Sequence, residues 1–393
     1  MSNELTQYGK KNKKRLKDFR CPAPFRDLMV FEKSTSVCCP EWFDIEQLKK
    51  DFPKDFDSSS ARNFPWEVSK LIKTDVIGNW NNKFHTKLRE AIGKGDYKYC
   101  SLMCPWLNKI NSASEHDIKN TFYKTPKNST LEYYEKHLKH LKLPKRVYFN
   151  FDTSCNLKCP SCRIELHTNT MNIENKKVLD AIDKQLGQGI QYITITGSGD
   201  PFYSNIFRNW LSETKEKKYP NLREIFIVSN GNMFTPKIWE SIKPSHRYIK
   251  GMEWSIDAAT KDTYENKTRL NGKWDKLMDN FSFLEKLSYK HLFGGLTFSF
   301  VIQDHNYHEI SAFVDLIESK AIKTKFKKIM FRAIQDWGHQ SKEWMKQRNV
   351  CDPSHPEHSK FLEEFKKVQN NPLVDSNVFH LLDSNPKFDT ALI

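Results

Sequence analysis

The sequence predicts an α/β fold in which a parallel sheet with flanking helices follows a small cysteine-rich module. Two observations lead to this prediction. Short apolar runs alternate with amphipathic stretches from Arg146 onward, and five of the nine cysteines lie before residue 106. A chain of 393 residues can bury a sizeable core, and a content of 38% hydrophobic and 13% aromatic residues is typical of globular rather than disordered chains.

Residues 1–20 form a basic N-terminal arm, which we expect to be solvated. Its run KKNKKRLK contributes to a net charge of +15. Such a charge favours polyanions through counterion release, but lysine and asparagine are frequent throughout the chain, so we do not expect a nucleic-acid partner. No apolar stretch approaches the roughly 18 residues of a membrane span, and the start has no secretory core. The sequence therefore predicts a cytoplasmic protein without a membrane partner.

Two regions follow the arm. Residues 21–106 are predicted to form the cysteine-rich module, and in a reducing compartment clustered cysteines bind metal more often than they form disulfides. Residues 107–145 are predicted to be a helical connector, with a helix over Ser129–Leu143 that Pro144 ends.

Residues 146–335 carry the alternating pattern, and residues 336–393 form a C-terminal extension with one helix near His358–Val368. The six β-like runs span 146–151, 192–196, 224–229, 252–257, 296–302 and 328–333. The amphipathic stretches are Lys177–Leu186, Asn205–Lys217, Pro236–Ile242, Asp275–Leu287 and Tyr307–Glu318. Strands that alternate with helices imply parallel βαβ units, whose chemistry lies in the loops at the carboxyl ends of the strands.

Three cysteines stand in such a loop. Cys155, Cys159 and Cys162 form a C-x3-C-x2-C pattern directly after the first run. Three thiolates on one tight loop can hold three irons of a cubane cluster and leave the fourth iron open. A zinc knuckle completed by His167 is an alternative, as are three buried structural cysteines.

This triplet and the motifs behind the later strands resemble the radical S-adenosylmethionine (SAM) enzymes over about residues 146–335. The motifs are TGSGDPF, SNG, SIDA with TYENKTR, and a Gln and an Asn after the fifth strand. The resemblance implies a partial (β/α)6 TIM-like barrel that binds a [4Fe-4S] cluster and SAM. It marks eight cofactor-binding candidates: Ser198, Gly199, Asp200, Ser229, Ser255, Arg269, Gln303 and Asn306.

The resemblance also implies roles for some of these residues. Asp200 would pair with the amino group of SAM, since a carboxylate suits an ammonium. Ser255 would contact the ribose, and Arg269 would bind the SAM carboxylate as a planar cationic fork. Asp257 would face the substrate as a catalytic candidate. Cys351 would donate a hydrogen atom to a product radical, as a cysteine does in some radical SAM epimerases; the alternative is a plain buried thiol.

The first hundred residues are similar to a SPASM-type auxiliary-cluster module. The resemblance covers CPAPF, VCCPEW, IGNW, KLREAI and YKYCSLMCP in that order. It implies a second [4Fe-4S] cluster on Cys21, Cys38, Cys100 and Cys104, with Cys39 as a substitute for Cys38. Such a cluster would accept an electron from a substrate radical, relay one to the SAM cluster, or bind substrate. A closed structural zinc site is the alternative.

The implied activity is reductive cleavage of SAM to a 5′-deoxyadenosyl radical, which abstracts a hydrogen atom from a substrate for epimerisation, dehydrogenation or rearrangement. A small molecule or sugar is favoured over a peptide, because only about twenty residues precede Cys21. A peptide- or protein-modifying enzyme is the first alternative, and a non-catalytic zinc protein that binds nucleic acid is an alternative of another class. An electron donor such as flavodoxin or ferredoxin would be a partner.

Overall fold

The computed structural model describes residues 21, 23–39, 42–53, 70–101, 104, 143–163, 165–168, 173–195, 198–337 and 340–378. These residues form a nine-stranded sheet in the order β2-β1-β3-β4-β5-β6-β7-β8-β9. Only β1 and β2 pair in the antiparallel sense. The predicted α/β fold is confirmed. The predictions for the basic arm and for the connector helix lie outside the described residues.

Six strands of the sheet correspond to the six predicted runs. They are β3 (Arg146–Asn150), β4 (Tyr192–Ile195), β5 (Glu224–Ser229), β6 (Ile249–Ser255), β7 (Phe293–Ile302) and β8 (Thr324–Ala333). The last three begin three or four residues earlier than predicted. Their opening stretches contain glycines or exposed lysines, such as Gly294 and Lys325, and these interrupt the apolar alternation that identifies a strand.

The helices between these strands follow the prediction except at some of their ends. They are α9 (Ile173–Gln185), α10 (Asn205–Ser212), α11 (Pro236–Ser241), α13 (Trp274–Ser288), α14 (Ile310–Glu318) and, in the C-terminal extension, α16 (His358–Val368). Helix α9 begins four residues earlier than predicted and α14 three residues later. The sequence predicted that α10 continues to Lys217. It ends at Ser212 because the buried ammonium of Lys215 folds back to donate to the carbonyl oxygens of Trp210 and Glu213.

The sheet extends beyond the six predicted strands on both sides. β1 (Asp27–Phe31) pairs in parallel with β3 along its whole length, and β2 (Thr35–Ser36) pairs with β1. At the other edge β9 (Val374–Ser376) pairs with β8. One sheet therefore includes strands from the cysteine-rich region, the middle of the chain and the C-terminal extension.

Short helices complete the described chain. They are α2 (Ala23–Arg26), α3 (Ile45–Asp51), α4 (Val76–Trp80), α5 (Lys83–Gly93), α12 (Lys261–Thr263) and α15 (Lys342–Arg348). Asn82 begins α5, where its side chain accepts a hydrogen bond from the His85 backbone. A π-helical turn over Tyr264–Thr268 follows α12.

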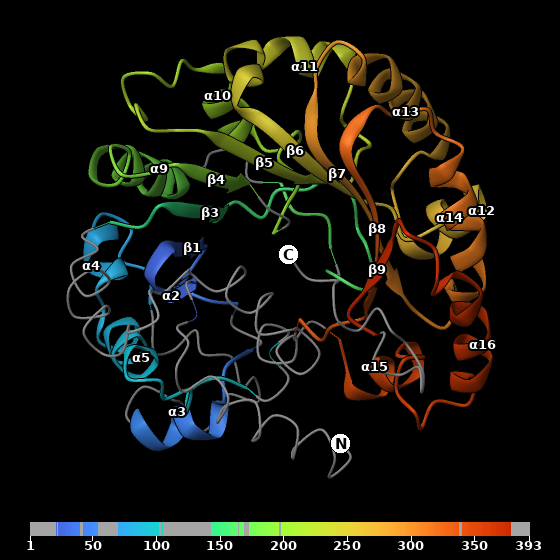
Figure 1. The fold of residues 1–393 in the computed structure, drawn as a ribbon, viewed down its shortest axis with the longest axis horizontal. Coiled ribbons are helices and arrows are strands. Elements are labelled where there is room, and N and C mark those ends of the chain that lie inside the picture. The colour runs from blue at the N-terminus through green and yellow to red at the C-terminus, as the bar shows by residue number, and fades with distance from the viewer. Residues whose placement is uncertain are drawn as a thin grey trace.

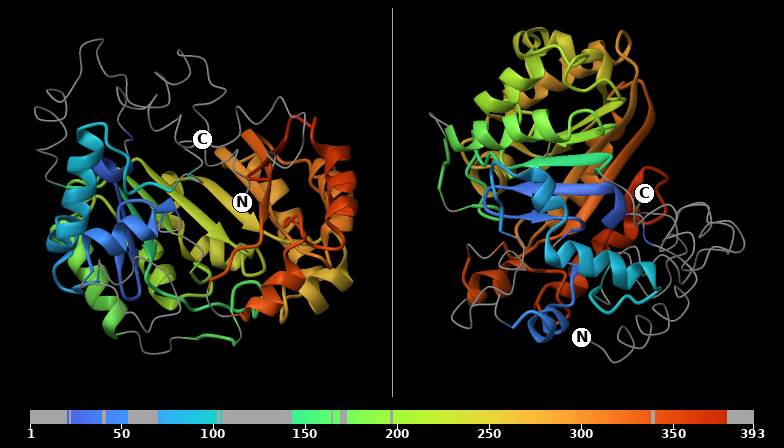
Figure 2. Two further views of the ribbon diagram at one scale, coloured as in Figure 1. Left: turned by 90° about the horizontal axis from the view of Figure 1, so that it is seen from below. Right: turned by 90° about the vertical axis from the view of Figure 1, so that its left-hand side faces the viewer.

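The sheet curves so that its two faces differ (Figure 1). Helices α9, α10, α11, α13, α14 and α16 lie along the outer face, and the inner face is turned to the interior of the molecule (Figures 1 and 2). Aromatic side chains fill the space between the strands and the outer helices, as where Phe149 of β3 meets Trp210 of α10 and Trp254 of β6 meets Phe281 of α13, with centroids 5.2 and 5.0 Å apart. This arrangement places the carboxyl ends of the parallel strands, and the loops that follow them, at one rim.

No helix formed by the described residues is both long and apolar enough to cross a lipid bilayer.

Candidate active site

The cysteine triplet lies in the loop that follows β3. Cys155 and Cys159 are buried and Cys162 is half-buried, and the three pack together with Leu157 in a small cluster of their own. The Cys155 backbone N–H donates to the His167 carbonyl at 2.9 Å, and the Cys162 N–H donates to the Cys159 carbonyl at 2.9 Å. The loop therefore holds three thiols on one tight turn at the rim of the sheet.

The start of this loop is fixed by a buried carboxylate that the sequence analysis missed. Asp152 accepts hydrogen bonds from the backbone and hydroxyl of Ser154, at 3.1 and 2.8 Å. Its other oxygen accepts from the Ser204 hydroxyl at 2.5 Å. Because Ser204 is also the residue that caps α10, Asp152 ties the cysteine loop to the helix behind the neighbouring strand.

The arrangement gives the zinc-knuckle alternative no support. His167 contributes its backbone carbonyl to the bridge with Cys155, and its side chain is exposed. Among the residues that the structure describes, no three His, Cys, Asp or Glu side chains converge as the ligands of a single metal ion. A tetrahedral zinc site needs such convergence, whereas a cubane cluster spreads its thiolates over separate irons.

Two arginines lie against the sulfur atoms. Arg269 Nη1 is 3.4 Å from Cys159 Sγ, and Arg163 Nη2 is 3.7 Å from Cys162 Sγ. Burial raises the pKa of the Cys159 thiol, and the Arg269 charge opposes that increase. Burial also raises the pKa of Cys155, to about 12, with Asp200 adding to the effect. Cationic hydrogen-bond donors beside buried sulfurs suit the negative charge of a thiolate-bound cluster, so the donor set fits an iron–sulfur group.

Arg269 is held by a buried ion pair. Its Nη2 is 2.8 Å from Asp257 Oδ2, and both side chains are almost fully buried. The other oxygen, Asp257 Oδ1, accepts from the Val301 N–H at 2.8 Å. The Asn306 amide donates to the Asp257 carbonyl at 3.0 Å. Asp257 has a φ of 62°, which is rare outside glycine, asparagine and aspartate. Both of its carboxylate oxygens are thus engaged, one with Arg269 and one with the backbone, and its catalytic role stays a prediction.

The loops after β4 and β5 meet at a second buried carboxylate. Asp200 Oδ1 accepts from the Phe202 and Tyr203 backbones, at 2.9 and 3.2 Å. Its Oδ2 accepts from the Ser229 hydroxyl and the Asn230 N–H, at 2.7 and 2.9 Å. The structure therefore shows Asp200 joining the two loops, and its contact with a SAM amino group stays a prediction.

Close backbone packing explains a glycine in the same turn. A Cβ atom on Gly199 would lie 2.4 Å from the Ser154 carbonyl oxygen and 2.8 Å from that of Asp152. Arg163 also bonds this turn, from Nη2 to the Ser198 carbonyl at 2.8 Å. Only a residue without a side chain lets the turn lie directly on the cysteine loop.

The comparison with known families decides the identity of this region. A model of the radical SAM superfamily matches residues 149–317. Residues 149–317 form a radical SAM domain. Such a domain indicates an enzyme of the radical SAM superfamily, whose members use a [4Fe-4S] cluster and SAM, and the prediction of an enzyme is confirmed. No curated protein matches the chain significantly.

The remaining SAM-binding candidates lie near the inner face of the radical SAM domain. The Ser255 and Ser299 hydroxyls are 3.0 Å apart across β6 and β7. Gln303 follows β7 and is 1% exposed, and neither polar atom of its amide has a hydrogen-bond partner among the described residues. A buried amide without partners is the kind of group that a ligand or water satisfies. Asn306 accepts from the Gln303 N–H at 2.7 Å.

Asn230 and Arg163 also contact the cysteine loop, although neither was among the predicted site residues. The Asn230 amide lies 3.8 Å from Cys155 Sγ and donates to Asn156 Oδ1 at 2.9 Å. The Arg163 guanidinium donates hydrogen bonds to Cys162 Sγ and to the backbone carbonyl oxygens of Thr153 and Ser198. The signal for Asn230 was present in the SNG motif, where only the serine was selected.

Cys351 is not brought to this site. It packs in the main hydrophobic core, whereas the triplet forms a separate cluster. Burial alone raises the pKa of its thiol. Its place is that of a small apolar core residue, and the hydrogen-donor hypothesis gains no support from the structure.

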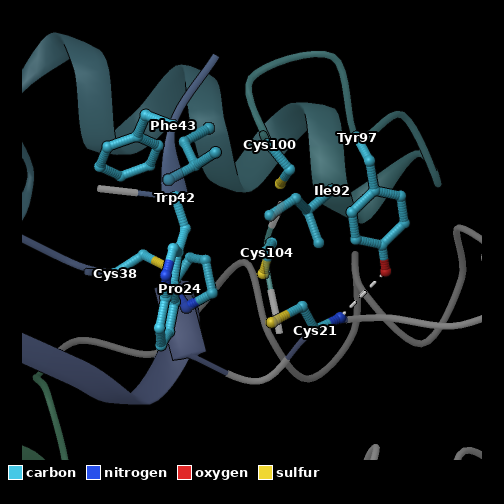
Figure 3. A pocket seen from close by; sticks show the side chains of 10 residues that line it. Cys21, Pro24, Cys38, Trp42, Phe43, Ile92, Tyr97, Cys100 and Cys104 are labelled. Carbon is cyan, nitrogen blue, oxygen red and sulfur yellow. Dashed lines mark hydrogen bonds between the residues drawn. The ribbon is translucent and has the colours of Figure 1, made fainter. Parts of the chain in front are cut away.

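The cysteines of the N-terminal region line a pocket of their own (Figure 3). Its walls include Cys21, Cys38, Cys100 and Cys104, together with apolar side chains from α2 and α5. The Cys21 N–H donates to the Tyr97 hydroxyl at 3.1 Å. Cys39 does not belong to the pocket wall. The structure thus brings together four of the five candidate auxiliary ligands.

Proposed function

We propose that this protein is a radical SAM enzyme that abstracts a hydrogen atom from a small-molecule or sugar substrate. The observation that supports it best is the convergence, at one rim of the sheet, of three thiols with Arg269 and the Gly199 turn. When bound, the cluster and SAM supply an electron and a 5′-deoxyadenosyl group, from which a strongly oxidising carbon radical arises. The chain itself must hold these groups, orient the reacting carbon and exclude water.

Different residues of the site would have different roles. The triplet would bind the cluster, and Arg163 and Arg269 would offset its negative charge. Asp257 fixes the guanidinium of Arg269, so that its free donors can meet a carboxylate of SAM. Gly199 lets the turn after β4 pack directly on the cysteine loop, which would hold the two loops in place around the cluster.

We also propose that the N-terminal pocket holds an auxiliary [4Fe-4S] cluster. Four thiols from three separate stretches of chain line it, and burial raises the pKa of Cys21 to about 11, with a further contribution from Asp27. The neighbouring thiols add to burial in raising the pKa of Cys38. Four thiolates are the ligand set of a [4Fe-4S] cluster.

Iron and sulfide analysis of the anaerobically reconstituted protein tests both proposals. Two clusters give about eight irons per chain and the SAM cluster alone gives about four. The protein with SAM and dithionite should release 5′-deoxyadenosine, and a Cys159→Ala variant should not. Zinc without iron would reject both proposals. Iron near four per chain with normal 5′-deoxyadenosine release would reject only the auxiliary cluster.

A further inference from the structure

The inner face of strands β6 to β9 carries charged side chains that neither the triplet nor the pocket uses. Strand alternation sets their direction. Trp254 packs on Phe281 at the outer face, so its neighbour Glu253 points to the inner face. Thr297 of β7 lies opposite Glu253 of β6 and opposite Lys328 of β8. Residues opposite one another in neighbouring strands point to the same face, so Lys328 shares the inner face with Glu253.

These charges form two ion pairs. Arg332 donates to both carboxylate oxygens of Glu253, which lies two strands away, with Nη2 to Oε2 at 3.1 Å. Lys328 Nζ is 2.7 Å from Asp375 Oδ2. The two carboxylate side chains are 12% and 4% exposed, whereas the Arg332 and Lys328 side chains are 36% and 35% exposed. The inner face is therefore balanced in charge and open to small polar molecules at its cations.

A buried amide completes the set. Gln303 follows the inward-facing Val301 by two residues, and Val301 lies opposite Arg332. The Gln303 side chain has a donor and an acceptor without partners among the described residues. Leaving such a group unpaired costs stability, so the Gln303 amide, which follows the strand that pairs with the Arg332 strand, can bind a ligand.

We propose that Glu253, Arg332, Lys328, Asp375 and Gln303, together called the polar row, bind the substrate, and that the substrate is a neutral polyhydroxylated ring such as a sugar or cyclitol. This inference rests on the proposed function. A ring hydroxyl donates to a carboxylate and accepts from the adjacent cation, so both ion pairs stay intact when it binds. An anionic substrate that drew Arg332 or Lys328 to itself would leave a buried carboxylate without its partner, which is strongly unfavourable.

The facing wall supports a ring-shaped substrate. Tyr148 of β3 and Phe226 of β5 share the inner face, because Thr194 lies opposite both of them in the register. Both aromatic side chains are half-buried. Aromatic faces offer an apolar surface on which the C–H side of a sugar ring can pack.

Binding to the full-length, reconstituted protein tests the inference. The probes are galactose, N-acetylglucosamine and myo-inositol, compared with glutamate, lysine and gluconate, at millimolar concentration, with saturation-transfer NMR as the readout. We expect transfer to at least one neutral ring and none to the charged probes. Binding of charged probes alone, or of no probe, would overturn the inference. Release of 5′-deoxyadenosine by the same preparation shows independently whether the proposed function holds.

Two variants separate binding from folding. The double reversal Glu253→Arg with Arg332→Glu keeps an ion pair but exchanges its donors and acceptors, so affinity for the ring should fall at least tenfold with iron content unchanged. The matched control is the same reversal of the exposed pair Lys261–Asp275. It should change neither the affinity for the ring nor the iron content. If the first reversal does not fold, Gln303→Leu replaces it: ring binding should fall while the melting temperature holds or rises. Unchanged binding in the variant that is used would overturn the inference.

Discussion

The ion pair between Asp257 and Arg269 makes the sharpest prediction, because both partners are buried and the backbone at Asp257 restricts which substitutions fit. Asp257→Asn keeps the shape of the side chain and an acceptor for the Val301 N–H, and asparagine tolerates a φ of 62°. Only the charge is lost. Removing one partner of a buried pair costs about 3–5 kcal/mol.

That cost sets a measurable shift in melting temperature. An unfolding entropy of about 2.1 cal/mol/K per residue gives about 0.8 kcal/mol/K for 393 residues, so Asp257→Asn should melt about 4–6 °C lower. Asp257→Ala should lose about 1–2 °C more, because alanine is strained at positive φ. Differential scanning fluorimetry on the anaerobically reconstituted protein measures both shifts.

The exposed pair Lys261–Asp275 provides the control. Its side chains are 53% and 76% exposed, and Lys261→Ala should change the melting temperature by about 1 °C or less, since surface pairs contribute little. A shift for Asp257→Asn no larger than that of the control would refute the argument that this pair is desolvated and fixes Arg269.

Three further predictions concern single positions. Gly199→Ala should lose most SAM cleavage, because the added methyl group overlaps two backbone carbonyls. Gly295→Ala should keep SAM cleavage, because its added atom has its nearest neighbour at 4.0 Å. Equal activity of the two variants would contradict the packing argument. Cys351→Ala should keep full turnover and melt about 1 °C lower, and loss of turnover would restore the hydrogen-donor hypothesis. Cys38→Ala should lose about four irons per chain and Cys39→Ala none, and the reverse result would assign the auxiliary ligand to Cys39.

The sheet of the radical SAM domain was predictable from sequence because its strands are apolar and regularly spaced. The strands that sequence reasoning missed lack this signal. β9 has three residues, VDS, and β2 has two. The DLMVF run of β1 is apolar but isolated, and it becomes a strand only because β3 provides a parallel partner. Pairing between strands that are distant in the sequence overrides local strand propensity, and the local sequence of β1 does not predict it.

The site was predictable where a motif identifies it and not where contacts depend on the three-dimensional fold. The triplet and Arg269 stand in recognisable patterns. Arg163 and Asp152 act through backbone carbonyls and a helix cap, and no spacing rule identifies them. The contacts of Asp257 also depend on the fold, because its positive φ and the Val301 N–H decide where its carboxylate points.

The placement of the two cysteine groups bears on what an auxiliary cluster would do. Cys21 precedes β1, and Cys38 follows β2, which runs antiparallel to β1, so both lie near the start of β1. The triplet follows the carboxyl end of β3, which is parallel to β1. The five residues of β3 alone span about 17 Å at 3.3 Å per residue. A cluster in the pocket would therefore lie toward the opposite end of these strands from the triplet. If the pocket holds a cluster and the inner face binds the substrate, both as proposed, a substrate near the middle of the strands would be within reach of both groups, which is the placement that an electron-accepting auxiliary cluster requires.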